Sequence, residues 1–288
     1  MFRALKRAFL GSLCVCAAVS AAAQTINPYL QATKPTSMVV NWKTAAAVTP
    51  KVRYGTSATA LNTTLTGTSQ SLNDVGYTNN YFYHTNKLQN LQPDTKYYYR
   101  AVSGTDSSAI LHFRTLPLPG NSPAGTGKLR FVILGDNQIK AQPRYDSLMT
   151  ATRRKLTELY GANYADSVTM ILNLGDQVDV GTLDHYENVH LQKSRYLSGV
   201  LPIQTAIGNH ETYGTLKLDA YYNHFVLDSM QYKGIYSGTE DYYAFQAGNV
   251  VVVYTYTETP GVSGTAGTTQ FNWFKKVIDS ANVVPTVK

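Results

Sequence analysis

The fold of this chain is decided by three short segments, Gly135-Asp136-Asn137-Gln138, Gly175-Asp176-Gln177-Val178-Asp179 and Gly208-Asn209-His210-Glu211. Each of them directly follows an apolar run that is typical of a buried strand in an α/β sheet. Such sheets place their functional groups where the chain leaves the carboxyl ends of the strands. We therefore expect three oxygen-bearing side chains and one histidine to converge at one edge of a sheet.

The first residues have the layout of a cleavable signal peptide. Arg3, Lys6 and Arg7 precede an apolar run over residues 8–19, and small residues follow at 21–23. We expect cleavage after Ala23 and a secreted or periplasmic protein, because no later apolar stretch is long enough to span a bilayer.

Net charge and cysteine content indicate which partners and which cross-links to expect. Removing residues 1–23 lowers the net charge from +7 to +4, since this segment contains three basic residues and no acidic one. The remaining basic residues form no run, so we predict no nucleic-acid partner, whereas a small positive excess suits an anionic substrate. Both cysteines, Cys14 and Cys16, fall within the signal, so we expect a mature chain without a disulfide.

Residues 24–116 are predicted to form a β-sandwich. Short strands alternate with turns, and no helical period occurs. The segment 91–100 (LQPDTKYYYR) resembles the corner of fibronectin type III domains, in which a tyrosine hydroxyl binds back to the turn. Tyr97 is the predicted corner tyrosine, and Trp42 is a predicted core residue.

A second domain is predicted to follow a linker. Residues 117–128 are rich in proline and glycine and are typical of an interdomain linker. From residue 129 to 288 apolar runs alternate with amphipathic stretches, which predicts an α/β domain in which a layered β-sandwich is flanked by helices. We expect strands over 129–134, 168–174, 203–207 and 250–254, and helices over 147–160, 184–197 and 269–281.

The three glycine-containing segments suit the chemistry of phosphate esters. Hydrolysis needs the anionic phosphate to be neutralised, a nucleophile at neutral pH and a proton for the leaving group, and a pair of metal ions supplies the first two. Asp136 and Asp176 each follow a glycine, which permits close approach of backbone and metal. Asn209 adds a neutral carbonyl oxygen, which is also a suitable hard ligand.

With these residues in order, the second domain resembles the calcineurin-like metallophosphoesterases, and the preceding sandwich makes the whole similar to the purple acid phosphatases. The resemblance implies that Asp136 binds one metal, Asp176 bridges two, and Asn209 binds the other. It further implies that Asn209 and His210 contact the phosphate and that His210 assists the leaving group, with Glu211 or a neighbour orienting it. The implied activity is hydrolysis of phosphomonoesters by metal-bound hydroxide, with phosphodiesters as the alternative and two Fe, Zn or Mn ions as cofactors.

The sequence departs from this family at three places. Asp179 stands where purple acid phosphatases carry the tyrosine that colours them, so we expect no purple colour and a supporting role for Asp179 behind the ligands. Gln138 stands where many relatives have a metal-binding histidine, and we expect its amide oxygen to be a weaker ligand. The later histidine and the Gly-His-x-His block of the family do not occur before Lys288. The C-terminal part of the domain therefore looks truncated, and we expect the 288-residue chain to be inactive or poorly folded by itself.

The competing hypothesis is a non-catalytic surface protein. In that case the sandwich would bind a glycan or a protein, and the second domain would be a degenerate scaffold. Gln138 and the missing histidines favour this alternative. The polar set made by Asp176 and the segment Gly208-Asn209-His210-Glu211 counts against it, because a scaffold has no structural need for such residues at adjoining strand ends.

Overall fold

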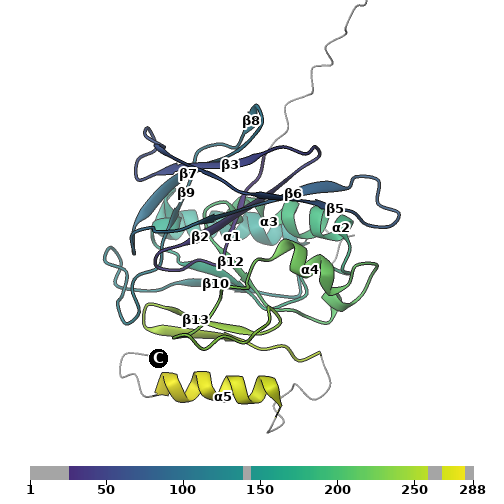
Figure 1. Cartoon of the computed structure of the whole chain (residues 1–288). Coiled ribbons are helices and arrows are strands. Elements are labelled where there is room, and N and C mark those ends of the chain that lie inside the picture. The colour runs from purple at the N-terminus through teal and green to yellow at the C-terminus, as the bar shows by residue number, and fades with distance from the viewer. Residues whose placement is uncertain (1–25, 139–143, 259–267, 283–288) are drawn as a thin grey trace, which may run out of the picture.

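The computed structural model describes residues 26–138, 144–258 and 268–282. The predicted signal peptide, residues 1–23, lies outside the described residues. In the described part no helix combines the length and the apolar character that a membrane span requires. Figure 1 shows a β-sandwich at the top, a parallel sheet with its helices in the middle, and a hairpin with one helix at the bottom.

The N-terminal part is a sandwich of two antiparallel sheets, as predicted. The first sheet contains, in spatial order, β1 (Tyr29–Gln31), β2 (Met38–Thr44), β6 (Tyr81–Leu88) and β5 (Thr68–Leu72). The second contains β4 (Thr63–Thr66), β3 (Pro50–Gly55), β7 (Lys96–Ser103) and β8 (Asp106–Ser107), and β9 (Leu111–Arg114) also pairs with β7.

Two predictions about the sandwich are confirmed. Trp42 is 1% exposed and belongs to the core between the sheets. The Tyr97 hydroxyl accepts a hydrogen bond from the backbone N–H of Gln92 at 2.9 Å, which makes Tyr97 the corner tyrosine. Its ring stacks on Phe113 in the same core, at a centroid distance of 5.7 Å. The corner therefore fixes the chain path into β7.

The second part is built on a parallel sheet of three strands. Its strands are β10 (Phe131–Leu134), β11 (Met170–Asn173) and β12 (Ile203–Thr205). Leu134 pairs with Asn173, and Asn173 pairs with Thr205, so the three strands end at the same level. This register brings the three glycine-containing segments to one edge of the sheet.

The helices of this part pack around the sheet. They are α1 (Arg144–Tyr160), the 3-10 turn η1 (Tyr164–Asp166), α2 (Leu183–His185), the π-helical turn η2 (Tyr186–Leu191), α3 (Gln192–Ser198), the 3-10 turn η3 (His210–Thr212), α4 (Leu218–His224) and α5 (Thr269–Asn282). The helix predicted over 184–197 is thus three consecutive pieces, because a π turn interrupts it. The hydrophobic period did not reveal α4.

A second layer covers the parallel sheet. It is the hairpin of β13 (Tyr243–Ala247) and β14 (Val250–Tyr254), and α5 lies on its far side (Figure 1). The hydroxyls of Tyr243 and Tyr254 donate hydrogen bonds to the β12 carbonyls of Thr205 and Gln204 at 2.7 and 3.0 Å. Trp273 of α5 packs against Tyr242 with ring centroids 4.9 Å apart. The predicted layered β-sandwich flanked by helices is confirmed.

The sandwich and the α/β part meet around His224. Its carbonyl oxygen accepts hydrogen bonds from the Tyr29 and Tyr83 hydroxyls and the Gln31 amide, each at 2.7 Å. Its ring stacks on Tyr186 at a centroid distance of 4.4 Å. His224 is completely buried. Its role is therefore to join the two parts.

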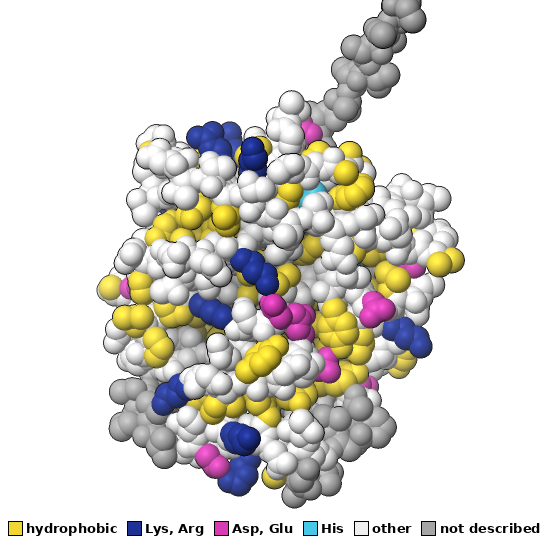
Figure 2. Space-filling model, viewed as in Figure 1, with side chains coloured by type: hydrophobic (Ala, Val, Ile, Leu, Met, Phe, Trp, Pro, Cys, Tyr) yellow, Lys and Arg dark blue, Asp and Glu magenta, His cyan; other side chains and the backbone are white. Residues whose placement is uncertain are grey.

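The basic side chains on the face in Figure 2 are scattered and interspersed with acidic ones, and they form no continuous basic patch there. This face gives no support to a nucleic-acid partner.

Candidate metal centre

Three aligned strand ends position the candidate ligands. Asp136 follows β10, Asp176 follows β11 and Asn209 follows β12, each after a glycine and within four residues of its strand. Asp176 is buried, Asn209 is half-buried and Asp136 is exposed. The register brings to one edge of the sheet the residues that the sequence singled out.

The backbone is strained at both aspartates. Asp136 has φ 51° and Asp176 has φ 54°, in the left-handed region that L-residues other than Asn and Asp rarely adopt. Strain of this kind costs about 1–3 kcal/mol per residue and persists only where the surroundings hold it. The two carboxylates therefore leave their strands through the same unusual turn.

A close approach of the second and third segments requires glycine at two positions. A Cβ added at Gly208 would lie 2.1 Å from Oδ1 and 2.6 Å from the backbone N of Asp176. Gly175 has φ +108°, and a Cβ there would lie 2.9 Å from the N of Gly208. Any side chain at these positions would separate the segments, so the glycines keep Asp176 next to the third segment.

The Glu211 side chain links the second and third glycine-containing segments by hydrogen bonds. Its carboxylate is fully buried and accepts hydrogen bonds from four backbone N–H groups. Those of Gly208 and Asp176 donate to Oε2 at 2.7 and 3.0 Å, and those of Gln177 and Val178 donate to Oε1 at 2.7 and 3.3 Å. Burial raises the pKa of Glu211 to about 7, against the opposing effect of these N–H groups.

The ring of His210 is oriented by a backbone carbonyl. Its Nδ1 lies 2.8 Å from the carbonyl oxygen of Asp179, and because a carbonyl only accepts, Nδ1 carries the proton. Nε2 is therefore the ring atom that is left for a substrate. The sequence left Glu211 or a neighbour as the orienting group. The structure shows the neighbour Asp179, while the Glu211 carboxylate binds the backbone instead.

The side chain of Asp179 lies close to a second histidine. Its Oδ2 is 3.7 Å from Nδ1 of His185, the last residue of α2. Asp179 thus contacts His210 through its backbone carbonyl, and its side chain lies near His185.

Amide side chains fill the space behind the aspartates. Asn173 donates to Oδ1 of Asn137 at 3.0 Å and its own Oδ1 accepts from Gln177 Nε2 at 3.1 Å. Gln177 also donates to the carbonyl of Ala206 at 2.8 Å. By contrast, Oε1 of Gln138 is buried and has no hydrogen-bond partner among the described residues. That oxygen is available to a cation.

The oxygen donors at the strand ends suit a hard metal ion, but only two of them are charged. Within the ranges that the structure describes, no three His, Cys, Asp or Glu side chains come together as a metal site. The available oxygens are the carboxylates of Asp136 and Asp176 and the amides of Asn209 and Gln138. Carboxylate and amide oxygens, with imidazole, are ligands of Mn, Fe and Zn. The donors are thus of a type that a hard metal ion accepts, and they carry two negative charges.

Sequence reasoning missed one residue that supports the site. Asp74, in the loop between β5 and β6 of the sandwich, is 8% exposed and reaches across to the α/β part. Its Oδ2 accepts from the backbone N–H of Leu183 at 3.0 Å, and its Oδ1 accepts from the Thr215 hydroxyl at 2.5 Å. These contacts fix the ends of two segments that we call the site loops, residues 179–183 and 209–217. No local pattern marks Asp74, since its partners lie more than 100 residues away.

The two site loops are also bound to each other. The backbone N–H of Gly181 donates to the carbonyl of Tyr213 at 2.7 Å, and its carbonyl accepts from Leu216 at 3.0 Å. A Cβ at Gly181 would lie 2.4 Å from the carbonyl oxygen of Lys217. The loops that carry Asp179 and His210 therefore form one unit, and the sandwich holds that unit through Asp74.

Comparison with solved structures supports the fold. The purple acid phosphatase PPD1 of yellow lupin (Lupinus luteus) superposes with a TM-score of 0.66 at 19% identity, over 88% of this chain and 48% of that one. PhoD gives a TM-score of 0.52 at 15% identity, over 80% of this chain and 51% of that one.

Comparison of sequences identifies the family. An uncharacterized protein of Mycobacterium tuberculosis, in two strains, is 28% identical over 242 residues, which cover 76% of this chain and 42% of that protein. The chain thus spans less than half the length of these relatives. Residues 24–115 match the N-terminal domain of purple acid phosphatases, and residues 129–286, more than half of the chain, match the calcineurin-like phosphoesterases. The chain belongs to the calcineurin-like phosphoesterase family and has a purple acid phosphatase type N-terminal domain.

Proposed function

We propose that this protein is an exported, metal-dependent phosphoric ester hydrolase that acts on phosphomonoesters in the manner of an acid phosphatase. The observation that carries the proposal is the alignment of three parallel strand ends, which Asp136, Asp176 and Asn209 each follow within four residues. Export rests on the signal-like residues 1–23, which predict a secreted or periplasmic location.

The proposed cofactors are two metal ions, as is typical of the family, chosen from Fe, Zn and Mn. Asp136, Asp176, Asn209 and Gln138 are the residues of this chain that would hold them. The fit is supported by the oxygen donors of these side chains and by the buried Gln138 oxygen, which has no hydrogen-bond partner among the described residues. When bound, such ions neutralise a phosphate and provide a nucleophile at neutral pH.

The chain itself supplies orientation and a proton. His210 has its Nδ1 proton committed to the Asp179 carbonyl, so Nε2 is the ring atom left to donate a proton to the departing oxygen when the ring is protonated. Glu211 keeps the backbone of the second and third segments fixed while this happens. The phosphate would lie against Asn209 and His210, between the ends of β11 and β12.

The test combines metal binding with turnover. The purified protein is incubated with Mn, Zn or Fe ions, freed of unbound metal, and assayed for bound metal and for hydrolysis of 4-nitrophenyl phosphate. We expect Asp176→Asn to lose both metal and activity. His210→Ala should keep the metal and lose about 10²–10⁴-fold in kcat. Asp219→Asn, an exposed residue at the start of α4, is the matched control and should change neither.

The outcomes separate the alternatives. Hydrolysis that is unchanged in Asp176→Asn would refute the mechanism. A folded wild-type protein that binds none of these metal ions would favour the non-catalytic scaffold, in which the sandwich binds a glycan or a protein. Faster turnover of bis(4-nitrophenyl) phosphate than of the monoester would make the protein a phosphodiesterase, because loops rather than metal ligands set this preference.

A further inference from the structure

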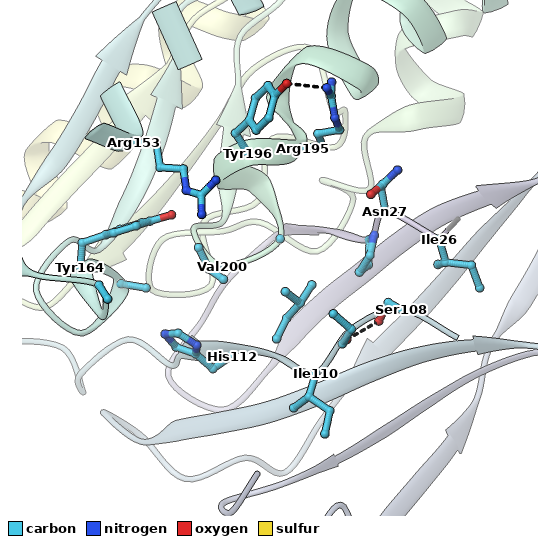
Figure 3. Close-up of a pocket in the computed structure, with 16 residues that line it drawn as sticks. Ile26, Asn27, Ser108, Ile110, His112, Arg153, Tyr164, Arg195, Tyr196 and Val200 are labelled. Atoms are coloured by element: carbon cyan, nitrogen blue, oxygen red, sulfur yellow. Dashed lines mark hydrogen bonds between the residues drawn. The ribbon is translucent and has the colours of Figure 1, made fainter. Parts of the chain in front are cut away.

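A cavity of about 480 Å³ lies between the sandwich and the α/β part, and none of the three glycine-containing segments lines it. Figure 3 shows its wall, formed by residues 26–28 and the β8–β9 segment on one side and by α1, η1 and α3 on the other. Pockets of about 300–1,000 Å³ typically hold small organic ligands. The size therefore suits a small molecule and not a polymer.

The charged residues of this cavity are of one sign. Arg153 of α1 and Arg195 of α3 line it, and no Asp or Glu is among its lining residues. Arg195 is engaged, with its guanidinium 2.5 Å from the Tyr196 hydroxyl and 3.8 Å from an Asp146 oxygen. Arg153 has no carboxylate within 4.0 Å in the described part of the chain, and Figure 3 shows its guanidinium between Tyr164 and Val200. Arg153 hydrogen-bonds to the neutral Tyr164 side chain, and no carboxylate among the described residues pairs with it.

The opposite wall is largely apolar. Ile110 of the sandwich is 41% exposed although it is a large hydrophobic residue, and it borders the cavity together with Leu111 and Ile26, while Val200 lines the cavity from the α3 side. An exposed isoleucine alone is ordinary, but four branched aliphatic side chains around one cavity offer a surface for an apolar body. The cavity is therefore amphipathic, with a cationic end and an aliphatic wall.

His112 adds a neutral polar group to the wall. Burial lowers its pKa, so it is uncharged near neutral pH. Its Nε2 is buried and has no hydrogen-bond partner among the described residues. A ligand with a polar group on its body would give this nitrogen a partner.

We propose that this interdomain cavity binds a small organic anion with an apolar body, whose anionic group pairs with Arg153 and whose body packs on Ile110 and Val200. Guanidinium binds carboxylate, sulfonate and phosphate groups through charge-assisted hydrogen bonds, and the apolar side chains of the cavity supply contact for the body of the ligand. The proposal does not depend on hydrolysis at the strand ends, so either can fail without the other.

The test measures binding of 2-naphthoate by isothermal titration calorimetry on the purified protein without added metal. Its neutral isostere, 2-naphthamide, serves as the ligand control. We expect the amide to bind about tenfold more weakly, which corresponds to the loss of one charge-assisted contact. Octanoate, an aliphatic anion, is the second probe and should bind at the same site.

Matched variants locate the site. Arg153→Gln should weaken naphthoate about tenfold, whereas Arg154→Gln, the next and exposed residue of α1, which does not line the cavity, should change the affinity less than twofold. Ile110→Ser should weaken it about fivefold by removing apolar contact. Both arginines are exposed, so their variants should fold as the wild type does.

Three results would overturn the proposal. One is the absence of binding by both anions at millimolar concentration. Another is equal binding of naphthoate and its amide, which would make the cavity merely apolar. The third is an Arg153→Gln variant that binds like Arg154→Gln, which would place the anion elsewhere.

Discussion

Replacing Glu211 by alanine should destabilise the protein more than any exposed charge change. The substitution removes a fully buried carboxylate and leaves the backbone N–H groups of Asp176, Gln177, Val178 and Gly208 without their acceptor. A buried donor without a partner costs about 1–3 kcal/mol. Because water enters the space left by the side chain and restores some of these bonds, we expect the free energy of unfolding to fall by about 3–5 kcal/mol, as when one partner of a buried charged network is removed.

Urea unfolding followed by tryptophan fluorescence measures this loss. Trp42 reports on the sandwich and Trp273 on the α/β part. Glu158→Ala is the control, because Glu158 lies exposed on α1 with Lys155 at 2.8 Å, and a surface pair of this kind contributes about 0.5 kcal/mol or less. A Glu211→Ala variant whose unfolding free energy stays within about 1 kcal/mol of the wild type would refute the role assigned to this carboxylate.

Three further predictions follow from the same contacts. Burial lowers the pKa of His224 from 6.5 to about 4, so the unfolded chain takes up a proton below about pH 6.5 that the folded chain refuses until about pH 4. The free energy of unfolding should therefore fall by about 3 kcal/mol from this side chain as pH drops through that window, while the raised pKa of Glu211 acts in the opposite direction. A His224→Gln variant whose unfolding free energy depends on pH between about 7.5 and 4.5 as the wild type's does, in urea titrations, would contradict the prediction. Gly208→Ala should displace the Asp176 carboxylate and abolish metal binding in the assay above, while Gly125→Ala, which has nothing within 4 Å of the added Cβ, should leave metal binding intact. Asp74→Ala should speed amide hydrogen exchange in both site loops measured by mass spectrometry, and unchanged protection there would show that the sandwich does not hold them.

The sequence predicted the parts that depend on local pattern. Apolar runs before glycine located all three strands of the parallel sheet, and the corner motif located Tyr97, because strand alternation and turn chemistry are encoded within a few residues. The helix after the second segment was predicted as one piece, since a hydrophobic period does not distinguish an α-helix from one that contains a π turn. Ends of strands differed by one or two residues, where hydrogen bonding rather than composition decides.

The contacts that the sequence did not predict join residues that lie far apart in the chain. The contacts of His224 with Tyr29 span 195 residues, and those of Asp74 with Leu183 span 109. Such contacts form only when the two domains are folded and packed together. A single residue that makes one of them does not belong to a periodic pattern, so the sequence does not mark it. The same holds for the cavity that Arg153 borders, which exists only because the β8–β9 segment docks on α1 and α3.

The conformation of the two aspartates distinguishes the competing functions better than the motifs alone. A turn that only needs a left-handed residue is formed at less cost by glycine, and glycine already precedes both positions. Instead the chain places a carboxylate at φ 51° and at φ 54°, and it surrounds Asp176 with Glu211 and Gly208, which hold that conformation. Turn geometry does not require a carboxylate at either place, whereas cation binding at the strand ends does. The left-handed conformation of Asp136 and Asp176 therefore favours the metal-dependent hydrolase over a scaffold in which polar residues only support the fold.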